Sequence, residues 1–302
     1  MTDTPDLVAI GEGMVEFHAE AVGFEADTFR RGFAGDVVNA LINASRLGLR
    51  CALVSRIGDD AFAPALVKAW EGEGIDLSHA PRVAGPNGIY FIMTDARGER
   101  SFIYRRTGSA ASQLSPADID AGWLCGARAV LLSGITQAIS ATAEAAVAAA
   151  AQVRGPLMCY DPNVRPTLWA LRGGIGAARA AFEEVAPRMN WLMPSYPADC
   201  GLLGDKTLTE DEALVAFAAY GPSVALKCGE DGVRLRMAGE SLHVAARPVA
   251  KVVDTTGAGD AWNGAFITGL LQGATPPAAA ARANDHAGAK LAHRGAIPPR
   301  GV

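Results

Sequence analysis

Short apolar runs that alternate with helical patterns constrain the fold of this chain more than any other feature of its sequence. Strand-like runs lie at 7–10, 51–55, 129–132, 157–160, 191–193 and 223–227, with helical patterns between them. Such alternation is typical of a mostly parallel sheet whose two faces are both covered by helices. We therefore expect an α/β protein built as a three-layer sandwich around one central sheet.

Helix signals agree with this interpretation. Gly35 and Asp36 precede a helical pattern that Leu47 and Gly48 would end, and a second helix is expected from Gly58 through Trp70. The alanine-rich stretches at 141–153 and 277–283 indicate helices packed closely against the sheet. The first of these is too short to cross a bilayer.

Two segments interrupt the alternation. Residues 12–33 contain short mixed pieces, and 88–94 and 100–106 flank a turn-like stretch at 95–99, which predicts a β-hairpin. No linker rich in Ser, Pro or charge separates these pieces from the rest. We predict one domain spanning 1–302, with a core from about 1–11, 34–84 and 112–302 and a small β-sheet lid from 12–33 and 85–111. The lid would cover the carboxyl edge of the sheet, where such folds bind ligands.

Composition excludes several classes of protein. The formal charge of -5 argues against a nucleic-acid binder, and the five cysteines are scattered without a Cys-x-x-Cys pair. Disulfides and a zinc site are therefore not expected, and a reducing cytoplasm is the predicted location. The acidic start of the chain runs directly into a strand, which argues against a signal peptide. Gly11-Glu12-Gly13 lacks the third glycine of a dinucleotide fingerprint, and no P-loop motif occurs.

The run from Val253 to Asp260 carries the strongest functional signal. Residues 242–253 indicate an arriving strand, and residues 261–271 have helical spacing. The glycines between them allow backbone N–H groups to converge at a helix N-terminus, which favours an anion. A capped helix start with Asp260 in its first turn is the ordinary alternative. A phosphoryl-transfer site explains the whole run better, because it also accounts for a carboxylate beside an anion pocket.

A second polar segment, from Asp161 to Pro166, follows an apolar strand and should also lie at the sheet's carboxyl edge. A solvated arginine on a surface loop is the ordinary interpretation of Arg165. However, strand alternation places Tyr104 and Arg106 on one face of the lid, so that one cleft would hold two guanidinium groups and a phenol. Two arginines suit a carboxylate-bearing sugar better than a neutral one.

The run ending at Asp260 resembles the second signature of the PfkB (ribokinase-like) sugar kinases. Within that family, the stretches 31–36, 90–106, 161–169 and 294–298 resemble the 2-keto-3-deoxygluconate kinases over essentially the full length. The resemblance implies a ribokinase-like fold, ATP and Mg²⁺ as cofactors, with a monovalent cation left open. It implies that Asp260 is the base, and that the amides of Gly257, Ala258 and Gly259 contact the transferring phosphate.

The resemblance also implies the remaining contacts. The residues expected to contact the sugar acid are Gly35, Asp36, Asn39, Tyr90, Tyr104, Arg106 and Arg165, with Arg165 as the carboxylate partner. Asn163 would face the phosphates and a magnesium shell. The other residues expected near the nucleotide are Ser195, Lys227, Gly229, Gly232, Gly257, Gly259, Asn284 and Ala287. An ordinary strand and turn with a surface lysine is an equally good explanation of Lys227 and Gly229.

One departure from the family pattern concerns magnesium. Many members carry Asn-x-x-Glu after the strand that corresponds to residues 191–193. This chain has Ser195 in place of the Asn, and its acid, Asp199, lies one position after the place of the Glu. No direct protein ligand to a metal is therefore assigned.

The leading hypothesis is an ATP-dependent kinase that phosphorylates 2-keto-3-deoxy-D-gluconate at its terminal hydroxyl. The alternatives are a related kinase for fructose or 2-keto-3-deoxygalactonate, and a non-catalytic sugar-sensing protein on the same fold. The expected partners are a small sugar acid and a nucleotide, with neither nucleic acid nor membrane. Because short lid strands expose edges, a homo-oligomer formed through the lid is also expected.

Overall fold

A sheet with nine strands forms the centre of the structure, a computed structural model that describes residues 4–23, 26–94, 100–204 and 207–300. The strand order is β15-β14-β13-β12-β11-β10-β1-β4-β6. All pairs from β6 to β13 are parallel, whereas the β13–β14 and β14–β15 pairs are antiparallel. The strands are β1 (Leu7–Ile10), β4 (Cys51–Val54), β6 (Ile75–Asp76), β10 (Ala129–Ser133), β11 (Leu157–Asp161), β12 (Trp191–Leu192), β13 (Ser223–Lys227), β14 (Val233–Met237) and β15 (Glu240–Val244).

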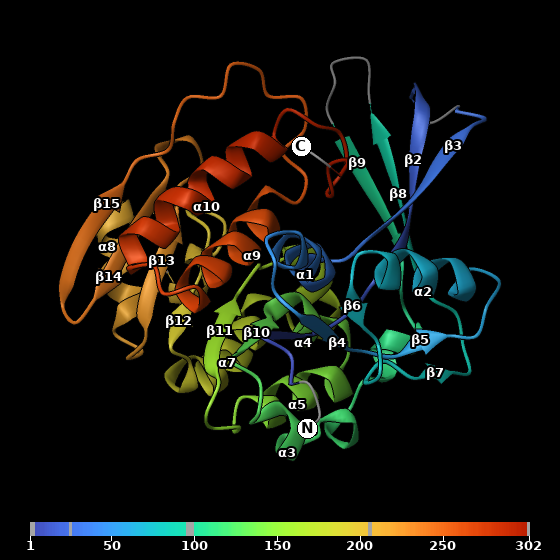
Figure 1. The fold of residues 1–302 in the computed structure, drawn as a ribbon, viewed down its shortest axis with the longest axis horizontal. Coiled ribbons are helices and arrows are strands. Elements are labelled where there is room, and N and C mark those ends of the chain that lie inside the picture. The colour runs from blue at the N-terminus through green and yellow to red at the C-terminus, as the bar shows by residue number, and fades with distance from the viewer. Residues whose placement is uncertain (1–3, 24–25, 95–99, 205–206, 301–302) are drawn as a thin grey trace.

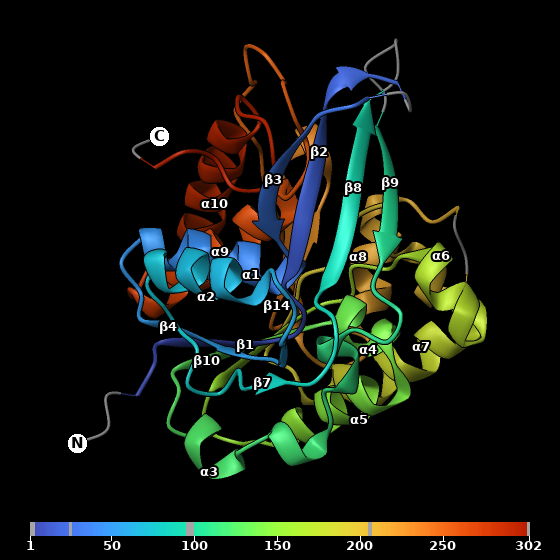
Figure 2. The ribbon, with the colours of Figure 1, turned by 90° about the vertical axis from the view of Figure 1, so that its right-hand side faces the viewer.

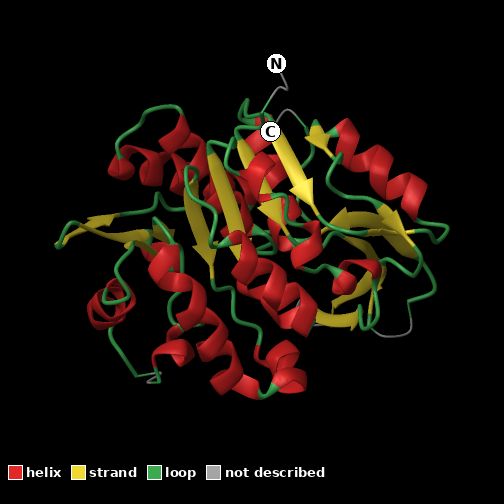
Figure 3. Ribbon diagram, turned by 90° about the horizontal axis from the view of Figure 1, so that it is seen from below, coloured by secondary structure: helices red, strands yellow, loops and turns green. Residues whose placement is uncertain are grey.

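Helices cover both faces of this sheet (Figures 1 and 3). Successive strand residues point to opposite faces, so Val8 and Ile10 enter one hydrophobic core while Leu7 and Ala9 enter the other. The first core is closed by α4 (Gly134–Ile139), α5 (Ala141–Ala150), α7 (Gly174–Val185) and α8 (Glu210–Ala218). The second is closed by α1 (Asp36–Arg46), α2 (Ala63–Gly72), α9 (Ala258–Leu271) and α10 (Pro276–Lys290). Two further short helices are α3 (Ala121–Leu124) and α6 (Pro166–Trp169). This is the three-layer arrangement that the alternation predicts.

A separate four-stranded sheet, hereafter the lid, projects from the core (Figure 2). It consists of β3 (Phe29–Ala34), β2 (Met14–Val22), β8 (Gly88–Thr94) and β9 (Arg100–Arg105), in that order. The β8–β9 pair is antiparallel, with Tyr90 opposite Tyr104. The turn expected at 95–99 lies outside the described residues. The two lid segments are those that interrupt the alternation in the sequence.

Two local predictions are wrong in their bounds. Ile57–Gly58 does not begin a helix but forms strand β5, which pairs with β7 (Arg82–Val83), and α2 begins only at Ala63. The strand expected over 242–253 forms only at its start: β15 ends at Val244, and the amides of Val253 and Asp254 donate to Leu291 O at 2.8 and 3.1 Å. A carbonyl at the end of α10 replaces the sheet partner that those residues would otherwise need.

Among the described residues, the structure contains no helix with the length and apolar character needed to span a membrane.

Candidate active site

A cavity of about 810 Å³ lies between the lid and the ends of the core strands. Its lining includes lid residues, residues that follow core strands, and the starts of α1 and α9. The predicted site residues in this lining are Gly35, Asp36, Asn39, Tyr90, Tyr104, Arg106, Asn163, Arg165, Ser195, Lys227, Gly257, Ala258, Gly259 and Asp260. Segments far apart in the sequence therefore meet around one space.

The N-terminus of α9 opens onto this cavity. Gly257 precedes the helix in the left-handed region, with φ of 74°, and a Cβ there would lie 2.8 Å from Ala296 O. Only glycine satisfies both the backbone angle and the close approach. Because the first amides of a helix lack intrahelical partners, the turn through Gly259 presents N–H donors and the positive end of a helix dipole. The arrangement suits a phosphate group.

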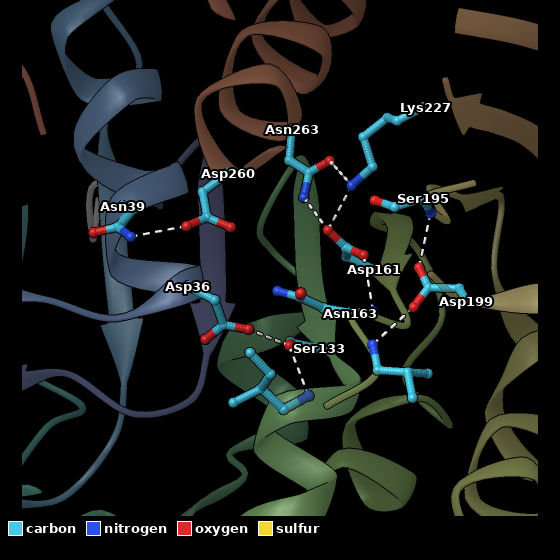
Figure 4. Close-up of polar contacts among 12 residues, drawn as sticks. Asp36, Asn39, Ser133, Asp161, Asn163, Ser195, Asp199, Lys227, Asp260 and Asn263 are labelled. Carbon is cyan, nitrogen blue, oxygen red and sulfur yellow. Dashed lines mark hydrogen bonds and ion pairs between the residues drawn. The ribbon is translucent and has the colours of Figure 1, made fainter. Parts of the chain in front are cut away.

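Asp260 lies in the first turn of α9, where its Oδ2 accepts a hydrogen bond from Asn39 Nδ2 at 2.8 Å (Figure 4). Burial raises the pKa of Asp260 to about 7, and the negative charge of Asp36 contributes in the same direction. The hydrogen bond from Asn39 opposes this shift because it stabilises the charged form. Such a carboxylate can take up a proton near neutral pH, as a general base must.

A second group of polar side chains surrounds Asp161 at the end of β11. Its Oδ2 accepts hydrogen bonds from Lys227 Nζ at 2.7 Å and from Asn263 Nδ2 at 2.6 Å (Figure 4). Lys227 Nζ also donates to Asn263 Oδ1 at 3.1 Å. The ammonium group of Lys227 is thus fixed by a carboxylate and an amide close to the start of α9, since a Cβ at Gly259 would lie 3.8 Å from it. A fixed positive charge at this position would attract a polyphosphate.

Asp199 explains the departure from the family pattern in structural terms. Its two carboxylate oxygens accept hydrogen bonds from Val164 N at 2.8 Å and Ser195 N at 2.7 Å (Figure 4). It therefore ties together the loops that follow β11 and β12. Burial, followed by the charge of Asp161, raises the pKa of Asp199 to about 6.

Asp36, at the start of α1, completes the acidic side of the cavity. Its Oδ2 accepts a hydrogen bond from Ser133 Oγ (Figure 4). Burial raises the pKa of Asp36 above its usual value. Gly35, just before it, is extended, and a Cβ there would lie 2.2 Å from Glu12 O. Glycine is required at this position because the two backbones approach each other so closely.

The lid side of the cavity carries aromatic rings and a buried arginine. The rings of Tyr90 and Tyr104 stack with centroids 5.6 Å apart, and the Arg106 guanidinium lies 4.6 Å from the centroid of Tyr104. Arg106 Nη1 lies 3.3 Å from Glu12 Oε2, a distance typical of an ion pair. The pair is poorly aligned, and Arg106 Nε and Nη1 have no hydrogen-bond partner in the described part of the chain. Arg106 therefore has buried donors that a ligand carboxylate or hydroxyl could satisfy.

Arg165 differs from Arg106 in its surroundings. It is exposed, and its Nη1 donates to the carbonyl of Val164 at 3.2 Å. Its neighbour Asn163 has a positive φ of 39°, and its backbone N–H donates to Asp161 Oδ1 at 3.0 Å. Asn163 and Arg165, on either side of Val164 in this strained segment, both belong to the lining of the cavity.

Four predicted nucleotide contacts are not in the described lining of the cavity: Gly229, Gly232, Asn284 and Ala287. Gly229 and Gly232 lie in the turn between β13 and β14, and a Cβ at Gly232 would lie 2.3 Å from Val244 O. Asn284 accepts from Trp262 Nε1 at 2.8 Å and donates to Val244 O at 2.9 Å. These hydrogen bonds hold α10 against α9 and β15, so a nucleotide contact by these residues stays a prediction.

Sequence reasoning assigned no role to Glu12, Asp161, Asp199 or Asn263, all of which are buried around the site. A signal existed for Asp161 and Glu12, since each directly follows an apolar strand or its first turn. Asn263 offered none, because its importance depends on Lys227 and Asp161, which are distant in sequence.

No group of three or more His, Cys, Asp or Glu side chains within the described ranges could hold a metal ion. This donor set fits Mg²⁺ only if phosphates and water supply most of its ligands, with one or two carboxylates assisting. Mg²⁺ commonly binds in that way.

Comparison with known proteins gives consistent results. The pfkB family carbohydrate kinase profile matches residues 4–300. The chain is 35% identical to a 2-dehydro-3-deoxygluconokinase from Thermoproteus tenax over 277 residues, which cover 89% of this chain and 83% of the relative. Among solved structures, a PfkB protein from Polaromonas sp. JS666 is 32% identical with a TM-score of 0.85, and 96% of each chain is covered. A putative ribokinase II from E. coli, in complex with ATP and Mg²⁺, is 25% identical with a TM-score of 0.85, covering 97% of this chain and 94% of that one. These matches confirm the expected fold class.

Proposed function

Because the chain belongs to the pfkB family of carbohydrate kinases, we propose that it transfers the γ-phosphate of ATP to the terminal hydroxyl of 2-keto-3-deoxy-D-gluconate. 2-Dehydro-3-deoxygluconate, the sugar acid named in its curated relatives, is the same compound. The residues around the cavity supply the parts that this reaction requires.

One observation carries the proposal. A single cavity is lined by Asp260 and the α9 N-terminus and also by Arg106 and Arg165. The first pair of features suits a phosphate and a hydroxyl that loses its proton, while the two guanidinium groups suit the carboxylate of the acceptor. A kinase for a neutral sugar has no use for both arginines.

The reaction places one demand on each group. The acceptor hydroxyl oxygen forms a bond to the γ-phosphorus, the bond from that phosphorus to the bridging oxygen of ADP breaks, and the hydroxyl proton passes to Asp260. Because phosphoryl transfer depends mostly on alignment and charge stabilisation, the amides from Gly257 to Gly259 contribute by holding the transferring group. Asn39 fixes the orientation of the Asp260 carboxylate through its hydrogen bond.

Mg²⁺ would be held mainly by the phosphates of ATP, with Asp161 at the end of β11 and Asp199 after β12 as assisting carboxylates in the cavity lining. When bound, the ion neutralises charge on the phosphates. Lys227 then holds Asp161 in a fixed position through the 2.7 Å contact between Nζ and Oδ2.

Two alternatives are compared with this proposal. 2-Keto-3-deoxygalactonate differs from the proposed acceptor in only one hydroxyl, so the same carboxylate contacts would serve it as a second acceptor. A non-catalytic sugar sensor would need the acceptor pocket but not a base with a pKa near neutrality. We further propose a cytoplasmic location and a homo-oligomer in which the lid edges of two subunits meet. Phe29, which is 38% exposed on the edge strand β3, supports that contact.

A panel of sugar acids and neutral sugars, each tested with ATP and Mg²⁺ in an ADP-release assay, tests the proposal. We expect the highest kcat/KM for 2-keto-3-deoxygluconate and a much lower value for fructose. Equal values for gluconate- and fructose-type acceptors would refute the carboxylate assignment. Saturable sugar binding without ADP release would identify the protein as a sensor.

A further inference from the structure

A buried lysine lies behind the phosphate-binding turn. Lys290 is the last residue of α10, and only 1% of its side chain is exposed to solvent. An ammonium group removed from water is costly unless oxygen atoms replace its hydration shell. Lys290 does not occur in the described lining of the active-site cavity, so its burial is not explained by a direct contact with either substrate.

Two contacts of Lys290 reach Asp254. Its Nζ donates to the backbone oxygen of Asp254 at 2.7 Å and lies 3.8 Å from Oδ1 of the same residue. The next residue of the chain, Leu291, accepts the amides of Val253 and Asp254 through its carbonyl oxygen at 2.8 and 3.1 Å. The end of α10 therefore fixes the backbone of Asp254 by a cation and by a carbonyl at once.

Asp254 passes this constraint to the phosphate-binding turn. Its Oδ1 accepts from Thr256 N, directly before Gly257, at 2.7 Å. Its Oδ2 accepts from Gly295 N at 2.7 Å. The residue after Gly295 is Ala296, which packs against Gly257 so closely that a Cβ there would lie 2.8 Å from Ala296 Cβ. One carboxylate thus holds both segments that shape the turn.

The charge state of Asp254 is consistent with this arrangement. Burial acts to raise its pKa, but hydrogen bonds from Thr256 and Gly295 together with the charge of Lys290 hold the pKa below its usual value. The carboxylate is therefore ionised throughout the neutral range, and the buried positive charge is balanced.

We propose that Lys290 is a positioning residue that acts as a fixed internal cation, holding the amides of the phosphate-binding turn in place through Asp254. Its ammonium group supplies one positive charge to a carbonyl and a carboxylate, which are the ligands that a monovalent metal ion would otherwise require. The turn of this protein therefore needs no such ion. The inference rests on the proposed kinase function, because the rate of phosphoryl transfer is one of its readouts.

Three variants separate the roles of charge and volume. Lys290→Met removes the charge and keeps most of the volume, whereas Lys290→Ala removes both and leaves space for a small cation. Lys251→Met removes an exposed lysine three residues before Asp254 and serves as the matched control. We expect Lys290→Met and Lys290→Ala to lower kcat on the order of 10²-fold, since small displacements of aligned groups have effects of that size. The control should keep the full rate.

The identity of the cation then distinguishes positioning from general stabilisation. Ammonium or potassium ions should raise the kcat of Lys290→Ala at least tenfold, whereas tetramethylammonium is too large to enter the space and should leave it unchanged. The kcat of Lys290→Met should not respond to any of these ions. The unmodified enzyme should have the same rate in potassium and in tetramethylammonium salts. A wild-type enzyme that gains tenfold or more from potassium would overturn the proposal, as would full activity of Lys290→Met. The wild-type comparison needs no variant, so it stands even if a substitution prevents folding.

Affinity for ATP, measured by calorimetry without any sugar, provides a readout independent of the acceptor. The affinity of Lys290→Ala should fall and should recover in ammonium salts, and an affinity indifferent to both changes would overturn the inference. If the wild-type protein binds ATP yet phosphorylates none of the sugars, the proposed function fails while this measurement still decides the role of Lys290.

Discussion

The pH dependence of turnover follows from the surroundings of Asp260. With a pKa of about 7, only about one tenth of the enzyme would carry the ionised base at pH 6, and about nine tenths at pH 8. We therefore expect kcat/KM to rise roughly tenfold between these values and to level off above them. A carboxyl with the ordinary value of 3.8 would give no change over this range.

Two variants should move this profile in opposite directions. Asp36→Asn removes a neighbouring negative charge that raises the pKa of Asp260, so the rise should shift to lower pH. Asn39→Ala removes the hydrogen bond that stabilises the ionised form, so the rise should shift to higher pH. The phosphate donor, ATP, is the same for wild type and both variants, so its own titration affects all three profiles equally. The differences between profiles therefore report the protein group.

The assay is the ADP-release rate at sub-saturating acceptor, with coupling enzymes in excess at each pH. A flat wild-type profile from pH 5.5 to 8 would contradict the assignment of Asp260 as the base. Shifts of the two variants in the same direction would show that the electrostatic explanation is wrong, even if the wild-type profile rises.

Three further predictions follow from the same site. Asp260→Asn should lower kcat by more than the roughly 10²–10⁴-fold typical of a lost general base, because orientation is lost too; near-normal turnover would remove it from the mechanism. At pH 8 the free energy of unfolding of the same variant, measured by chemical denaturation, should exceed that of wild type by about 2–4 kcal/mol. The reason is that a carboxyl whose pKa is raised in the folded state stabilises the fold below pH 4 and loses that contribution as the pH rises to 7. Equal stability of the two proteins at pH 8 would contradict the raised pKa. Arg165→Ala should weaken binding of the sugar acid by about 2–4 kcal/mol without changing the melting temperature. Arg106→Ala should weaken this binding too, and should also destabilise the fold by about 3–5 kcal/mol because Glu12 stays buried without its counter-ion. Arg105→Ala changes a side chain that points to the opposite face of the lid and is the control for both binding and stability.

Local patterns were sufficient to predict most of the fold. The strands that end at Asp161 and Lys227 were visible because their apolar runs are short and followed by polar residues. The lid was visible because the alternation stops there. The strand expected over 242–253 stops at Val244 because β-branched residues favour a strand only where a partner strand is available, and the end of α10 takes that place for Val253.

The site was predictable where one segment carries the chemistry. The residues from Gly257 to Asp260 form a continuous motif, so their place in the lining of the cavity could be expected from the sequence alone. The environment of Asp161 could not, because Lys227 and Asn263 lie 66 and 102 residues away in the chain. For the same reason the role of Lys290 was not visible: it depends on a contact with Asp254, 36 residues earlier.

The chain connections between the lid and the core all lie at one end of the lid sheet. Met14 and Ala34 pair where β2 and β3 meet the core, and Ile89 pairs with Arg105 at the same end (Figure 2). A small rotation of the lid about this connected end would move its distant residues further than those near the core. The lid residues that line the cavity, such as Tyr90 and Tyr104, can therefore vary with the acceptor, while the phosphate-binding groups in the opposite wall stay the same.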